Sequence, residues 1–143
     1  MIMSTIRDLL KKSGYSDKAI EYYKNHVNVG ILDNPDAHYM FTGPCGDTME
    51  IFLKIISGII TEAKFQAIGC AGSFSSGSAL TEMIIGKTLQ ESEKIDERDI
   101  LEHLGAMPKE KVHCARLTVM TLLKAIEHYQ NKDQMSNLIN NKA

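Results

Sequence analysis

The sequence lacks a long hydrophobic run and a secretory leader. No apolar stretch reaches the roughly 18 residues that a transmembrane helix requires, so we expect no membrane span and no membrane partner. The first fourteen residues carry Arg7, Asp8 and Lys11 and have no long apolar core, so we expect a helical extension rather than a signal or transit peptide. These absences make the cytoplasm the default location.

The sequence also has no large excess of positive or negative charge, and its number of cysteines is odd. Its 16 basic and 18 acidic residues give a formal net charge of −2, so a nucleic acid is not an expected partner. Three cysteines cannot all pair within one chain, which argues against a disulfide framework. The Gly/Ser-rich stretch 69–78 matches neither nucleotide-binding glycine pattern, so no phosphate loop is predicted.

The composition is that of one globular domain. The chain has 143 residues, of which 43% are hydrophobic and 24% are charged, enough to bury a core without disulfides. It contains no internal repeat and no linker. We divide it into an N-terminal helical extension (1–14), a single domain (15–130) and a polar C-terminal tail (131–143) that we expect to fray.

Two stretches alternate between apolar and polar residues, as half-buried strands do. They span 49–55 and 60–68 and flank Ser57-Gly58, which predicts an antiparallel hairpin. Residues 39–42 are a weaker candidate for a third strand. Helical periodicity follows over 71–86 and 111–129, and Ser16 and Asp96 are positioned to cap shorter helices. The prediction is an α+β fold, with helices on one face of a small three-stranded antiparallel sheet.

Each cysteine lies at the edge of a predicted element. Cys45 lies in the loop Gly43–Asp47 before the first long strand, Cys70 lies between the second strand and a helix, and Cys114 lies in the first turn of the last helix. A helix N-terminus favours negative charge and lowers the pKa of a cysteine there. We predict a metal-binding or nucleophilic role, while a role as small core residues stays open.

Three neighbouring polar residues are further candidates. Asp47, two residues after Cys45, is either a fourth ligand or the cap of its own turn. His113 is either an alternative ligand or a residue that orients or shields the site. Adjacent residues on a helix diverge, so no catalytic pair of His113 and Cys114 is predicted. Lys111 either stabilises a thiolate, pairs with Asp47 or is simply solvated.

At these positions the sequence resembles the IscU/NifU-type iron–sulfur scaffold family. The resemblance covers about residues 15–130, and it is carried by one N-terminal segment and three cysteine motifs in the same order. These are Tyr15-Ser16-Asp17-Lys18 through His26-Val27-Asn28-Val29-Gly30, then Gly43-Pro44-Cys45-Gly46-Asp47, then Ile68-Gly69-Cys70-Ala71-Gly72-Ser73, and finally Lys111-Val112-His113-Cys114. Together the three motifs are highly specific.

The resemblance implies an assembly scaffold and carrier rather than an enzyme. A cysteine desulfurase would pass persulfide sulfur to Cys114, an electron donor such as ferredoxin would take part, and iron would join. A [2Fe–2S] cluster would form on Cys45, Cys70 and Cys114, with Asp47 or His113 completing the ligand shell. Asp47 would assist release to acceptor apo-proteins. A homodimer is compatible with this role.

The main alternative is a zinc-dependent persulfide relay that never carries a cluster. Thiolates bind both zinc and iron, so the ligand types alone do not separate the two, and the resting form is apo, zinc-bound or cluster-bound. The interval between Cys70 and Cys114 lacks the long insertion of the zinc-binding SufU-type relatives, which favours cluster assembly.

The segment Met107-Pro108-Lys109-Glu110-Lys111 keeps only the first proline and the lysine of the family's chaperone-recognition motif. Recognition by an Hsp70-type chaperone therefore does not follow from it.

Overall fold

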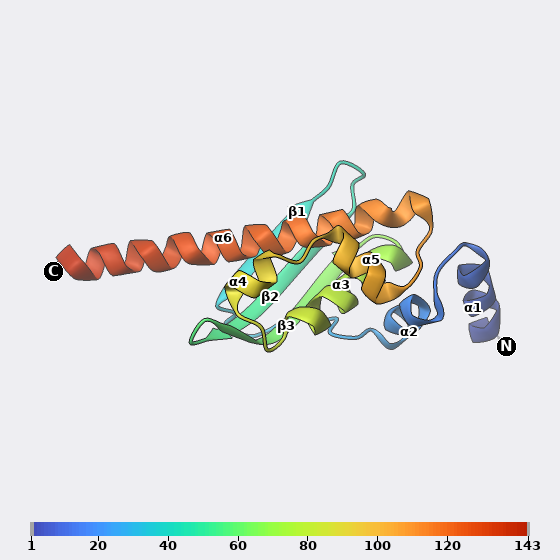
Figure 1. Ribbon diagram of the computed structural model, residues 1–143, viewed down its shortest axis with the longest axis horizontal. Helices are drawn as coiled ribbons and strands as arrows, with labels where there is room; N and C mark the ends of the chain where they lie inside the picture. The colour runs from blue at the N-terminus through green and yellow to red at the C-terminus, as the bar shows by residue number, and fades with distance from the viewer. Residues whose placement is uncertain (1, 143) are drawn as a thin grey trace.

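The computed structural model describes residues 2–142 (Figure 1). Two helices, α1 and α2, precede the sheet strands β1, β2 and β3, and the remaining helices follow them. Their bounds are α1 Ile2–Lys12, α2 Asp17–Asn25, β1 Ala37–Thr42, β2 Thr48–Ile56, β3 Ile59–Ile68, α3 Ala71–Ile84, α4 Leu89–Glu93, α5 Glu97–Leu104, the 3-10 turn η1 Lys109–Lys111 and α6 Val112–Lys142.

The sheet is the antiparallel one that the alternating residues predict, with strand order β1-β2-β3. The turn between β2 and β3 is formed by Ser57 and Gly58, whose φ angles of 53° and 77° suit a tight hairpin turn. At the other end of the sheet, Thr48 pairs with Thr42 on one side and with Ile68 on the other. The loop that contains Cys45 and the residue before Cys70 therefore lie at the same end.

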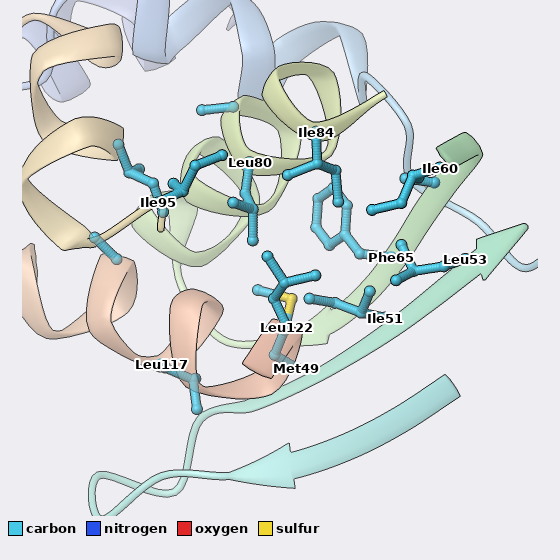
Figure 2. Close-up of a cluster of buried hydrophobic side chains, with 14 of the residues drawn as sticks. Met49, Ile51, Leu53, Ile60, Phe65, Leu80, Ile84, Ile95, Leu117 and Leu122 are labelled. Carbon is cyan, nitrogen blue, oxygen red and sulfur yellow. The ribbon is translucent and has the colours of Figure 1, made fainter. Parts of the chain in front are cut away.

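One face of the sheet is buried under helices. Met49, Ile51 and Leu53 of β2 and Phe65 of β3 are fully buried, and they meet Leu80 and Ile84 of α3 and Leu122 of α6 (Figure 2). Helix α6 crosses β1 and β2, while α3 lies against β3. The prediction of an α+β fold with helices on one face is confirmed.

The small residues at the start of α3 allow it to approach the sheet closely. Residues 75–79 are all buried. At Gly77, an added Cβ would lie 2.4–2.7 Å from three ring atoms of Phe65, closer than real Cβ contacts allow. This close packing fixes the height of α3 above β3 and with it the position of Cys70 at the N-terminus of the helix.

Three details differ from the prediction. Helix α6 does not end near residue 129 but continues to Lys142, and it projects beyond the sheet (Figure 1). Helix α3 ends at Ile84, two residues early. Helix α4 was not predicted, although Thr88 and Glu91 form a capping box whose Thr-x-x-Glu spacing is visible in the sequence.

The predicted N-terminal helix is present as α1. It is held to α2 by ion pairs, of Arg7 with Glu21 at 2.7 Å and of Lys11 with Asp17 at 3.1 Å. All four side chains are more than one-third exposed, so water screens both pairs and they add little to the stability of the fold. Among the described residues, no helix is long and apolar enough to cross a membrane.

Candidate metal-binding site

Three chain segments meet at the end of the sheet where Thr42, Thr48 and Ile68 pair. They are the loop between β1 and β2, the junction of β3 with α3, and the start of α6. Each contributes one of the cysteines. Cys45 lies in the loop, Cys70 is the N-cap residue of α3 and Cys114 is the third residue of α6. All three cysteines are free thiols.

The thiols of Cys70 and Cys114 form the centre of the site. Their sulfur atoms lie 3.7 Å apart, although the residues are 44 positions apart in sequence. Cys114 is fully buried and Cys70 is partly exposed. The contact between α3 and α6 therefore brings two thiol groups to one point.

The two thiols ionise very differently. A hydrogen bond from Cys114, the backbone N–H groups of Ser73 and Gly72 and the charge of Lys111 together lower the pKa of Cys70 to about 4, against the opposing effect of burial. The same hydrogen bond, together with burial, raises the pKa of Cys114. The pKa of Cys114 is therefore not lowered as its place at the helix N-terminus led us to expect, because its bond to Cys70 and its burial raise it.

Asp47 and His113 complete a second group around Cys114. One ligand atom from each of these three residues lies within 4.8 Å of the other two. The Nε2 atom of His113 is 3.9 Å from Oδ2 of Asp47 and 3.7 Å from the sulfur of Cys114. His113 and Cys114 therefore do not diverge as expected of helix neighbours, because the imidazole nitrogen contacts the thiol.

Cys45 lies farther out than the other two cysteines. It is exposed, and it lines a cavity of about 460 Å³ together with Asp47, His113 and Leu117. Its loop is closed by hydrogen bonds from the Gly43 N–H to the Asp47 carbonyl and from the Gly46 N–H to the Gly43 carbonyl. Within the part of the chain that the structure describes, Cys45 is not in the close ligand group. Its loop contains a left-handed glycine, Gly46.

Lys111 acts on the site through its charge. It contributes to the low pKa of Cys70, as one of the predicted alternatives required. The ion pairs found among residues 5–135 do not include one between Lys111 and Asp47. The side chain of Asp47 is instead close to His113 and to Ser73.

Comparison with known proteins decides the family. Residues 14–136 match the family model described as the NifU-like N terminal domain. The chain belongs to this family. It is 41% identical over 123 residues to the iron–sulfur cluster assembly scaffold protein IscU of Azotobacter vinelandii, which covers 82% of this chain and 95% of that one.

Two further similarities agree with this assignment to the NifU-like N-terminal family. The iron–sulfur cluster assembly scaffold protein IscU 1 of Archaeoglobus fulgidus is 39% identical over 120 residues, covering 83% of this chain and 78% of that one. The solved structure of the N-terminal NifU-like protein from Brucella abortus superposes with a TM-score of 0.68 at 20% identity, covering 82% and 94% of the two chains. That likeness shows the shared fold.

Sequence reasoning missed three residues that the NifU-like fold places at the thiols. Ser73 is fully buried, and its hydroxyl contacts both Asp47 and Cys114. Tyr15 is buried, and its burial together with the charges of the Cys70 and Cys114 thiols raises the pKa of its hydroxyl. At Gly72, an added Cβ would lie 3.2 Å from the Cys114 sulfur. All three lie inside motifs that carry the resemblance, which was the only signal available.

Proposed function

We propose that this protein is a scaffold on which a [2Fe–2S] cluster is assembled and from which it is passed to acceptor apo-proteins. The observation that carries the proposal is the 3.7 Å contact between the sulfurs of Cys70 and Cys114, with Asp47 and His113 beside it. The scaffold names of the relatives support the same role. In this role the protein is a carrier, not an enzyme.

The ligand count fits such a cluster. Two tetrahedral iron atoms that share two sulfides need four terminal ligands from the protein. Three thiolates and one further donor supply this number. We assign Cys45, Cys70 and Cys114 as the thiolates and Asp47 as the fourth ligand, with His113 as its alternative. Cys45 joins by movement of its exposed loop.

Sulfur arrives as a persulfide from a cysteine desulfurase. A thiolate of the scaffold attacks the outer sulfur, the sulfur–sulfur bond breaks, and the thiolate of the desulfurase leaves. The delivered sulfur has to gain two electrons to become the sulfide of the cluster, so an electron donor such as ferredoxin is required. We assign Cys114 as the acceptor, as the family resemblance implies. Because Cys114 is buried, docking has to expose it.

Release of the cluster depends on the mixed ligand set. The carboxylate of Asp47 is a hard oxygen ligand among soft thiolates, so it binds cluster iron less firmly than a fourth thiolate would. Its loop contains Gly46, at φ 88°, where an added side chain would meet nothing within 4 Å. No neighbouring atom at Gly46 therefore blocks a change in the loop when the cluster is handed over.

A zinc-dependent persulfide relay is the second candidate. One observation favours a zinc-bound form, since Asp47, His113 and Cys114 present oxygen, nitrogen and sulfur atoms within 4.8 Å of one another. The colour and metal content of protein purified without oxygen distinguish the two functions. A brown protein with iron and labile sulfide supports the scaffold, and a colourless protein with zinc that never accepts iron and sulfide supports the relay.

The scaffold function predicts that each cysteine is needed for the cluster but not for the fold. Replacing Cys45, Cys70 or Cys114 singly with serine should abolish stable cluster assembly in anaerobic reconstitution, because serine supplies no thiolate. Circular dichroism should show the helices of the wild type. A single variant that retains full iron and sulfide would remove that residue from the ligand set.

Persulfide should form on Cys114 after incubation with a cysteine desulfurase and cysteine. The test is demanding, because the structure alone would favour Cys70 as the acceptor. Cys70 has the lowered pKa, whereas Cys114 is buried. Mass spectrometry of peptides from the anaerobic reaction locates the added sulfur. If most of it is found on Cys45 or Cys70, the assignment of the acceptor is wrong.

Removing the carboxylate of Asp47 should slow release. The Asp47→Ala variant is expected to assemble a cluster that is retained longer and passed more slowly to an apo-ferredoxin, because the weak ligand is replaced by His113 or another group. Absorbance during anaerobic transfer gives the rate. Transfer at the wild-type rate, or no cluster at all, contradicts a release role for Asp47.

A further inference from the structure

Ser73 is a buried hydroxyl whose hydrogen-bond partners are both candidate ligands. It is the third residue of α3 and is fully buried. Its Oγ atom lies 3.3 Å from Oδ2 of Asp47 and 3.7 Å from the sulfur of Cys114. A serine has one proton to donate, and a carboxylate is a stronger acceptor than a thiol. The hydroxyl therefore donates to Asp47 while that residue is ionised.

Other buried hydroxyls of α3 serve the fold instead. Ser75 donates to the carbonyl of Ala19 at 2.7 Å, and Ser78 donates to the carbonyl of Val27 at 2.7 Å. Thr81 donates to carbonyls of its own helix. These bonds satisfy a buried donor with backbone, which is the usual arrangement. Ser73 differs because its partners are the side chains of the site.

The backbone beside Ser73 leaves room for this contact. A Cβ added at Gly69 would lie 2.7 Å from Oγ of Ser73 and 3.1 Å from both Cγ and Oδ2 of Asp47. Any larger residue at position 69 would push the hydroxyl and the carboxylate away from their present places. Glycine here is explained by the Ser73–Asp47 pair, since no left-handed φ requires it.

We propose that Ser73 is a positioning residue that holds the carboxylate of Asp47 toward Cys114. Without the hydroxyl, Asp47 is free to turn into solvent, because its side chain is already 23% exposed and its loop contains Gly46. The proposal rests on the ligand role proposed for Asp47. Groups that orient a metal ligand from behind typically change metal affinity by about 10- to 100-fold when they are removed.

The test is a double-mutant cycle on zinc affinity. Competition with a chelator measures Zn²⁺ binding to the wild type, Ser73→Ala, Asp47→Ala and the double variant. Ser73→Ala should weaken Zn²⁺ binding by about 10-fold or more in the wild type. In the Asp47→Ala background the same change should have almost no effect, because the residue through which it acts is gone.

A matched control separates positioning from folding. Ser75→Ala removes a buried hydroxyl from the same helix, but its partner is the Ala19 carbonyl, so Zn²⁺ affinity should stay unchanged. Gly69→Ala would place a methyl group against both Ser73 and Asp47 and should also weaken Zn²⁺ binding. This second variant keeps the test valid if Ser73→Ala fails to fold.

The outcomes are distinct from those that bear on the scaffold function. Unchanged Zn²⁺ affinity in Ser73→Ala, or an equal loss with and without Asp47, overturns the positioning role even if the protein assembles a cluster. Coupling of the two residues in the Zn²⁺ cycle supports the role, even if the protein then never retains iron and sulfide and the scaffold function fails.

Discussion

The close packing of α3 on β3 is the constraint on which the site depends. Gly77 lies so close to Phe65 that any side chain there would collide with the ring, and the neighbouring serines are buried with it. This contact fixes the N-terminus of α3, and so Cys70, at the end of the sheet. Helix α6 crosses the same face of the sheet (Figure 1). It brings the sulfur of Cys114 to 3.7 Å from that of Cys70.

Around this pair the remaining candidate ligands lie on a loop rather than on helices. Cys70 and Cys114 are positioned by helices, whereas Cys45 and Asp47 belong to a short loop with a left-handed glycine. A site for storage would hold every ligand on rigid elements. A site that builds and gives away its cargo is better served by two fixed ligands and two movable ones, with Ser73 holding the movable carboxylate in place before the cargo arrives.

Much of the fold was predictable from local patterns. The alternation of Met49, Ile51 and Leu53 located β2, and the Ser57-Gly58 turn located the hairpin, because both signals are contained in a few consecutive residues. Helix α4 was missed although its capping box was readable. The end of α6 was misjudged because a polar stretch can continue a helix when its residues favour helical structure.

The sequence points to the candidate residues of the site but not to their electrostatics. The cysteines and Asp47 stand out in sequence because of their motifs, and the structure brings Asp47, Cys70 and Cys114 to one end of the sheet. Which thiol ionises depends on a hydrogen bond between residues 44 positions apart. The contact of His113 with Cys114 depends on the side-chain conformation of His113 at the start of α6. Neither follows from spacing along the chain.

The central claim is that this thiol and carboxylate site binds a [2Fe–2S] cluster with unlike ligands on its two irons. Mössbauer spectroscopy of protein reconstituted anaerobically with ⁵⁷Fe and sulfide tests it most directly. We expect two iron signals of equal area, one from iron bound only to sulfur and one from iron that also has an oxygen ligand. If the protein retains no iron and sulfide with all three cysteines intact, or gives a single iron signal, the site does not bind the cluster in this way.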